Sequence, residues 1–166
     1  ALHQLPSGVF YKHTVNIIGN GVALNIPYLI KEIETLREKG INPNILISER
    51  TQVLMPYHVL FDKYEEERLA ERQFGSTKSG IAPFYSDKYA KTGIQVCDLF
   101  YPDRLKEKLR QICEVKNVLL KYLYNKPLLD PEALFDELMG YREMIQPYVC
   151  NTFDYLQKAM SENKNI

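Results

Sequence analysis

The sequence has no excess of charge of either sign and contains few cysteines. Its 166 residues include 21 lysines and arginines against 21 aspartates and glutamates, so the formal net charge is +0. A balanced chain has no overall field that would attract nucleic acid or a membrane surface, which argues against both as partners. The cysteines Cys97, Cys113 and Cys150 are odd in number and widely spaced. This usage is typical of free thiols in a reducing cytosol and predicts a cytoplasmic protein.

Three further signals are missing. No apolar run approaches the 18 residues of a membrane span, so we expect no membrane-spanning helix. The phosphate-binding motif GxxxxGK[ST] does not occur. His3, His13 and His58 have no metal-ligand spacing among themselves or with the cysteines. Surface or packing roles are therefore favoured for these histidines over a metal site.

The composition that remains is that of a globular domain. Hydrophobic residues make up 45% of the chain and charged residues 25%, and the length fits about one domain. The sequence starts without a capped element and closes on a polar run, so we expect a segment of a longer protein, with Ala1 as a cloning remnant.

The first 50 residues predict a strand, a helix and a second strand. Residues 14–25 contain two short β-branched runs around the Gly-Asn-Gly sequence at 19–21, which indicates a tight turn more than a ligand loop. Residues 25–40 have helical apolar spacing, an asparagine cap and a glycine stop. Residues 44–48 (NILIS) predict a buried strand. This βαβ unit belongs to a parallel sheet, and because two strands are not stable alone, its other strands are expected from outside the segment.

The remainder of the chain has helical patterns. Long helices are expected over 55–72, 101–124 and 129–160, with a kink or break at Pro147. The acidic and basic run at 62–68 is interpreted as the solvated face of the first of these helices.

The expected fold class is therefore α/β and helix-rich. A βαβ corner of a larger parallel sheet forms residues 1–50, as a partial α/β nucleotide-binding domain. A mostly α-helical subdomain forms residues 51–166 and carries a substrate loop at 75–93.

That loop, GSTKSGIAPFYSDKYAKTG, is the best candidate for chemistry. Its glycines allow tight turns, Ser76, Thr77 and Ser79 offer hydroxyl groups, and Lys78 offers a charge. Successive backbone N–H groups in such a loop form a nest for an anion. From spacing alone, an anion site and a plain connection between helices both remain open. Residues 84–93 predict a short helix stopped by Gly93.

The same residues resemble the adenylosuccinate synthetase family. The resemblance rests on LPSG near the start, on IIGNGV, and on the long stretch from Gly75 to Leu99, with its Gly-Ser-Thr loop, its Asp-Lys pair and its ending GIQVCDL. It extends over essentially the whole chain. The family's chains are much longer, so the resemblance implies an internal fragment that lacks the N-terminal phosphate loop and the C-terminal part.

The resemblance implies a function for the longer protein. The family joins inosine monophosphate (IMP) to L-aspartate with GTP and Mg²⁺ on the route to AMP, and it acts as a homodimer. Catalytic residues and metal ligands would lie outside this segment, so the isolated fragment is expected to be inactive. The alternative is a non-catalytic helical interaction or dimerisation module that has kept the loop as a scaffold.

Site residues carry over only where the motif matches. Thr77 matches the family threonine that contacts the IMP phosphate, and Lys91 stands where the family usually has an arginine that reaches the partner subunit's site. Lysine keeps the charge but loses the bidentate fork. Ser76 and Lys78 are expected as supporting residues, although Lys78 and Ser79 replace a common Gly-Arg pair.

Overall fold

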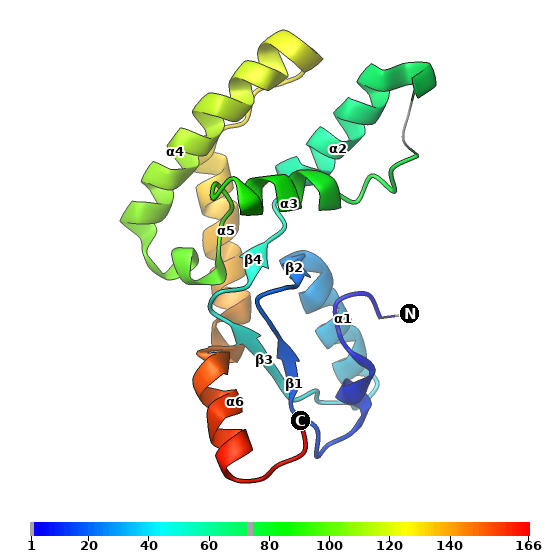
Figure 1. Ribbon diagram of the computed structural model, residues 1–166, viewed down its shortest axis with the longest axis vertical. Helices are drawn as coiled ribbons and strands as arrows, with labels where there is room; N and C mark the ends of the chain where they lie inside the picture. Colours follow the sequence, from blue (N-terminus) through cyan, green and yellow to red (C-terminus); the bar gives the residue numbers. More distant parts are fainter. Residues whose placement is uncertain (1, 73–74) are drawn as a thin grey trace.

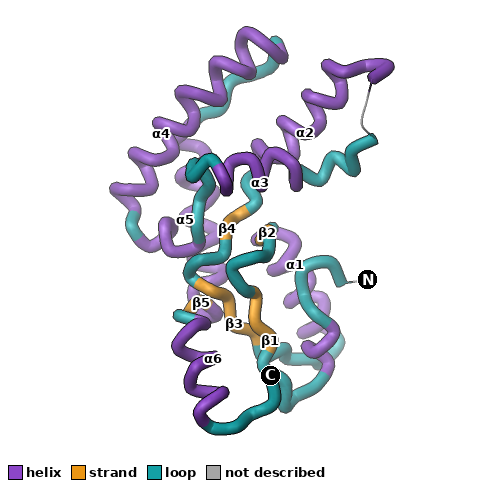
Figure 2. Tube along the Cα trace, in the orientation of Figure 1, coloured by secondary structure: helices purple, strands orange, loops and turns teal. Residues whose placement is uncertain are grey.

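A computed structural model describes residues 2–72 and 75–166, and Ala1, expected to be a cloning remnant, lies outside them. An α/β part is built around short parallel strands, and a group of helices stands at the other end of the molecule (Figures 1 and 2). The strands are β1 (Asn16–Ile18), β2 (Ala23–Leu24), β3 (Ile45–Ser48), β4 (Gln52–Val53) and β5 (Val149–Cys150). The α-helices are α1 (Ile26–Glu38), α2 (Pro56–Leu69), α3 (Ile81–Tyr89), α4 (Pro102–Leu119), α5 (Pro131–Ile145) and α6 (Thr152–Ser161).

Shorter helical turns join these elements. The 3₁₀ turns are η1 (Ser7–Phe10), η2 (Ala70–Arg72), η3 (Val96–Phe100) and η5 (Gln146–Tyr148), and η4 (Leu120–Tyr124) is a π-helical continuation of α4.

The predicted strand–helix–strand unit is confirmed. β1 and β3 pair in parallel, with Ile17 opposite Leu46, and α1 connects them. The expectation that the remaining strands come from outside the segment is wrong for the third strand, because β5 of this chain pairs in parallel with β3 through Ile47 and Val149. Segments about a hundred residues apart in sequence thus share one sheet. β2 and β4 form a second, two-stranded parallel sheet.

The local signals of α1 act as expected. The Asn25 side chain accepts a hydrogen bond from the backbone N–H of Tyr28, which caps the first turn. The apolar residues at helical spacing are buried in the core, namely Ile26, Leu29, Ile33 and Leu36. Gly40 follows the helix with φ of 74°, a left-handed conformation that glycine adopts without steric cost.

The helical part also follows its predicted pattern, including the expected break at Pro147, and differs from it at the helix of the loop region. The predicted helix over 129–160 breaks at Pro147, where η5 and β5 separate α5 from α6. The helix of the loop region starts and ends earlier than its predicted range of 84–93, since α3 begins at Ile81 and stops at Tyr89. The residue that turns the chain is Lys91, with φ of 62°. A Cβ at Gly93 would lie 2.4 Å from the Gln52 Oε1 atom, the end of a flexible side chain that would have to shift.

One hydrophobic cluster connects both parts of the molecule. It contains apolar residues of β1 and β3, of α1, and of α2, α4 and α5. Cys97, Cys113 and Cys150 are free thiols. Within residues 2–72 and 75–166, no helix combines the length and apolar character that crossing a membrane requires.

Candidate functional site

The loop before α3 is attached to one face of α2. The Asp62 carboxylate accepts hydrogen bonds from both ends of the loop, from the Ser76 hydroxyl at 2.6 Å and from the Gly80 N–H at 2.8 Å. Glu66, one turn further along α2, accepts the N–H of Gly75 at 3.3 Å. Two carboxylates of one helix therefore determine where the loop begins and where it ends.

Between these attachments the loop has a left-handed turn and paired hydroxyl groups. Lys78 has φ of 55°, and its N–H donates to the Ser76 hydroxyl at 3.1 Å. The hydroxyl groups of Thr77 and Ser79 are 2.7 Å apart. Since the amides at 75, 78 and 80 already have acceptors, the candidate donors for an anion are the amides at 76, 77 and 79 and the Thr77–Ser79 hydroxyl pair. Fewer groups of the loop are therefore available to bind an anion than the prediction from the sequence assumed.

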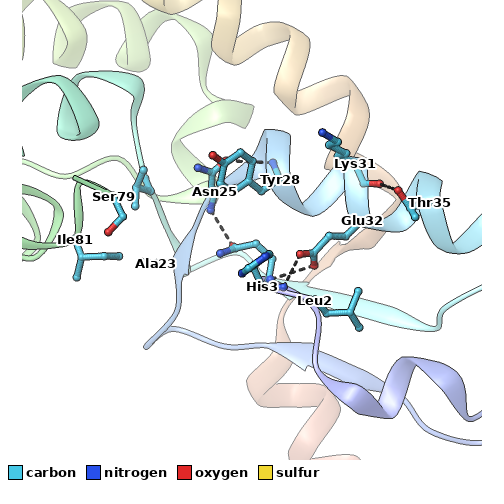
Figure 3. A pocket seen from close by; sticks show the side chains of 12 residues that line it. Leu2, His3, Ala23, Asn25, Tyr28, Lys31, Glu32, Thr35, Ser79 and Ile81 are labelled. Atoms are coloured by element: carbon cyan, nitrogen blue, oxygen red, sulfur yellow. Dashed lines mark hydrogen bonds between the residues drawn. The ribbon is translucent and has the colours of Figure 1, made fainter. Parts of the chain in front are cut away.

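The loop borders a hollow of about 660 Å³ on the α/β side of the molecule. Ser79 and Ile81 lie on one side of it, and side chains of α1, among them Tyr28 and Lys31, lie on the other (Figure 3). Glu32 of α1 accepts the N–H groups of the N-terminal residues 3–5 and so holds that segment against the hollow. Thr77 and Lys91 are not among the lining residues. The hollow has room for a small organic ligand, and the 75–93 stretch meets it through Ser79 and Ile81.

Thr77 and Lys91 lie beyond opposite ends of α3. Thr77 precedes the helix and exposed Lys91 follows it, and nine helical residues span roughly 13 Å. Figure 1 shows the two ends of α3 directed to opposite sides. The turn at Lys91 is fixed by the Asp87 carbonyl group, which accepts the N–H of Thr92 at 2.9 Å and that of Gly93 at 3.2 Å. The structure therefore does not bring Thr77 and Lys91 to one place within a single chain.

A largely buried ionic network holds α3 against α2 and α4. The Asp87 carboxylate is 2.9 Å from Nε2 of His58 and 2.8 Å from the Lys116 ammonium nitrogen. His58 is only 1% exposed, and its Nδ1 accepts the N–H of Met55, so Nε2 carries the proton that is donated to Asp87. The Lys116 ammonium group also lies 4.9 Å from the centre of the Tyr57 ring.

This environment changes two pKa values. Burial lowers the pKa of His58 and outweighs the opposing effect of the Asp87 carboxylate. Burial, the largest single influence on Asp87, acts to raise its pKa, but the hydrogen bonds from His58 and Lys116 together hold that pKa below its usual value. A neutral histidine and an ionised aspartate are thus the stable pair at neutral pH.

Sequence reasoning missed the role of α2. The prediction that residues 62–68 form a solvated face is wrong for Asp62 and Glu66, which are 7% and 3% exposed. His58 has a packing role, as expected, but it belongs to the same buried polar face. The available signal was spacing, since positions 58, 62 and 66 recur every four residues beside the apolar Tyr57 and Phe61.

Comparison with known proteins agrees with this arrangement. The sequence model of the adenylosuccinate synthetase family matches residues 1–166. The chain belongs to the adenylosuccinate synthetase family. Adenylosuccinate synthetases of Brachyspira hyodysenteriae and Caldicellulosiruptor saccharolyticus are 43% and 41% identical over 166 residues, covering 99% of this chain in each case. The resemblance inferred from the loop motifs is thereby confirmed.

A solved structure of the family has the same fold. It is described as fully ligated adenylosuccinate synthetase from Plasmodium falciparum, and it matches 98% of this chain with a TM-score of 0.80 and 26% sequence identity. The chain spans only 38% of that protein and 39% of each of the two bacterial adenylosuccinate synthetases.

Proposed function

We propose that the protein carrying this segment is an adenylosuccinate synthetase, a ligase that joins IMP to L-aspartate at the expense of GTP. The observation that carries the proposal is the family match over residues 1–166, together with a substrate loop whose two ends are fixed to α2. Under this proposal, residues 1–50 are part of the nucleotide-binding domain, and residues 51–166 are a helical subdomain that presents the loop. A cytoplasmic location is part of the same proposal.

In this function the loop binds the IMP phosphate. The Thr77 hydroxyl and the free amides beside it are suited to donate hydrogen bonds to phosphate oxygens, and charged acceptors make such bonds short and strong. Lys78 adds positive charge to the loop, and Ser76 shapes it through its bond to Asp62. The contribution of this segment is to bind and orient the substrate.

Lys91 is proposed to serve the other subunit of a homodimer. Its place beyond the far end of α3 separates it from its own chain's Thr77 by roughly 13 Å of helix. An ammonium group on a lysine side chain does not span that distance. A second copy of the chain, with its Thr77 loop against this Lys91, would bring both residues to one phosphate.

The metal ion of the family lies outside this scheme. Among the described residues, no group of three or more His, Cys, Asp or Glu side chains could hold a metal ion. The Mg²⁺ that the family implies thus does not fit the residues at hand, and its ligands are proposed to lie elsewhere in the longer protein.

The test uses the complete protein that contains this segment. We expect formation of adenylosuccinate that depends on IMP, L-aspartate and GTP together. Thr77→Val, which removes the hydroxyl at similar size, should raise the KM for IMP about tenfold, and Thr77→Ser should restore most of the affinity. Absence of turnover in the unmodified protein would reject the ligase and leave the alternative of a non-catalytic helical module.

A further inference from the structure

Three polar residues of α2 form a buried row beneath the substrate loop. His58, Asp62 and Glu66 follow one another at four-residue spacing on one face of the helix and are 1%, 7% and 3% exposed. Buried polar groups are costly unless they are hydrogen-bonded, and carboxylates in particular are seldom buried without a partner. His58 is bonded to Asp87, Asp62 to Ser76 and Gly80, and Glu66 to Gly75. All four partners lie in the 75–93 stretch.

Asp62 is the central residue of this row. Its Oδ1 accepts the Ser76 hydroxyl and its Oδ2 accepts the Gly80 N–H, so a single carboxylate binds the residues immediately before and after the 77–79 segment. Gly80 has φ of 80°, and a Cβ there would lie 2.7 Å from the backbone nitrogen of Val59. The exit of the loop is therefore pressed directly against the backbone of α2.

The result is a fixed span of three residues that contains Thr77. Its two ends are held by the same side chain, and inside it the Thr77 and Ser79 hydroxyl groups are bonded to each other. Side chains that determine the geometry of a binding group raise affinity by removing the need to order that group when the ligand arrives.

We propose that Asp62 is a positioning residue for IMP binding. This inference rests on the proposed function of the loop. Asp62 does not touch the substrate. It holds residues 76 and 80 at a set separation, and so presents the Thr77 hydroxyl and the neighbouring amides in the conformation that receives a phosphate group.

The experiment compares variants of the complete protein. In Asp62→Ala both bonds are lost, and we expect the KM for IMP to rise about tenfold to a hundredfold while the KM for GTP stays unchanged. In Asp62→Asn the amide oxygen can accept the Gly80 N–H and the amide nitrogen can donate to the Ser76 hydroxyl, so most of the affinity should return. Ser76→Ala removes one of the two bonds and should give an intermediate KM in a folded protein.

Glu67→Ala provides the matched control. Glu67 lies on the same helix, is 41% exposed and forms its ion pairs with Lys63 and Lys126. We expect its KM for IMP to match that of the unmodified protein. Amide hydrogen exchange adds a readout without catalysis, since the Gly80 N–H should exchange at least about tenfold faster in Asp62→Ala and at the original rate in Glu67→Ala.

The outcomes separate the two proposals. A merely structural role for Asp62 would lower the folded fraction, which reduces the apparent kcat but leaves the KM for IMP unchanged. Any of three results would overturn the positioning role. These are a lower apparent kcat with an unchanged KM for IMP, an equal rise in the KM values for IMP and GTP, and an unchanged Gly80 exchange rate. An unmodified protein without IMP-dependent turnover would instead reject the ligase function, and with it the substrate role of the loop.

Discussion

At the scale of single residues, two glycines in different environments allow a paired test. Gly80 has φ of 80° and lies against the α2 backbone, whereas Gly140 lies inside α5 with open space around its Cα. Gly80→Ala adds both an unfavourable backbone conformation and a close contact, so we expect a loss of about 1–3 kcal/mol in the free energy of unfolding. Gly140→Ala should gain up to about 1 kcal/mol through helix propensity. Denaturant unfolding of both variants measures the two changes, and equal effects would contradict the assigned role of Gly80.

His58 makes stability depend on pH in a defined direction. Because burial lowers its pKa in the folded state below the value of about 6.5 in the unfolded chain, the unfolded state takes up the proton first as the pH falls. This contribution to the free energy of unfolding is fully present above pH 6.5. Below that pH it declines by up to about 1.4 kcal/mol per pH unit until the folded-state pKa is reached.

His58→Gln supplies the comparison for this pH dependence. Glutamine can accept the Met55 N–H and donate to Asp87 but does not titrate. Urea unfolding at several pH values should give a flatter profile below pH 6.5 for His58→Gln than for the unmodified chain. Identical slopes would show that His58 is not the responsible group. The lowered pKa of Asp87 adds a separate loss of stability only below about pH 4, where that carboxylate becomes protonated.

At the scale of secondary-structure elements, the sequence predicts those features that depend on residues close together in the chain. The Asn25 cap, the apolar spacing of α1 and the break at Pro147 are local signals, and the structure agrees with each. The end of α3 was misplaced because the positive φ at Lys91 occurs in a residue type that seldom adopts it. The prediction relied on Gly93, two residues later, where a Cβ would only require the Gln52 side chain to shift.

The polar face of α2 shows why a candidate site is harder to predict than its elements. A run of charged residues on a helix usually faces solvent, and most of this run does. Asp62 and Glu66 are buried because the loop residues Gly75, Ser76 and Gly80 fold back over them. The four-residue spacing of positions 58, 62 and 66 places them on one helix face, but it does not show that the loop covers that face, because the contact depends on the tertiary position of the loop. Thr77 belonged to the candidate anion loop on local grounds, whereas its specific phosphate role and the choice of Lys91 came only through family resemblance, and both roles remain predictions.

At the scale of the whole molecule, the parallel sheet joins distant parts of the sequence. β5 enters the sheet beside β3 from the end of a long helical region, and a two-residue strand carries no sequence signal that would reveal this. The sequence therefore predicted the strand–helix–strand unit but not the third strand of the sheet.

The 166-residue chain alone should bind IMP weakly. One threonine hydroxyl, a few free amides and the lysines offer little net free energy once association has cost at least about 4 kcal/mol. We expect a dissociation constant in the millimolar range, which corresponds to a binding free energy on the order of −4 kcal/mol. We expect no ligase turnover. Isothermal titration calorimetry with IMP measures this affinity, and a micromolar value would show that the segment contains most of the binding site.

The relation between Thr77 and Lys91 is tested in the complete protein. A cation facing a dianionic phosphate in a partly closed site contributes roughly 1.5–3 kcal/mol, so Lys91→Ala should weaken IMP binding about tenfold to a hundredfold. Alanine and lysine both carry a Cβ, so the backbone strain at φ of 62° is retained and the fold should be intact. Lys39→Ala, at the exposed end of α1, is the control and should bind IMP normally.

Mixing the Thr77→Ala and Lys91→Ala proteins under conditions of subunit exchange then decides which chain Lys91 serves. If each site takes Thr77 from one subunit and Lys91 from the other, a mixed dimer has one site with both defects and one site with none. Activity at low IMP concentration should then recover toward half of the unmodified value in the mixed dimers. If Lys91 acts within its own chain, every site keeps one defect and mixing restores nothing. Confirmed exchange without recovery would therefore reject the shared site, and it would leave Lys91 as a solvated lysine in the turn after α3.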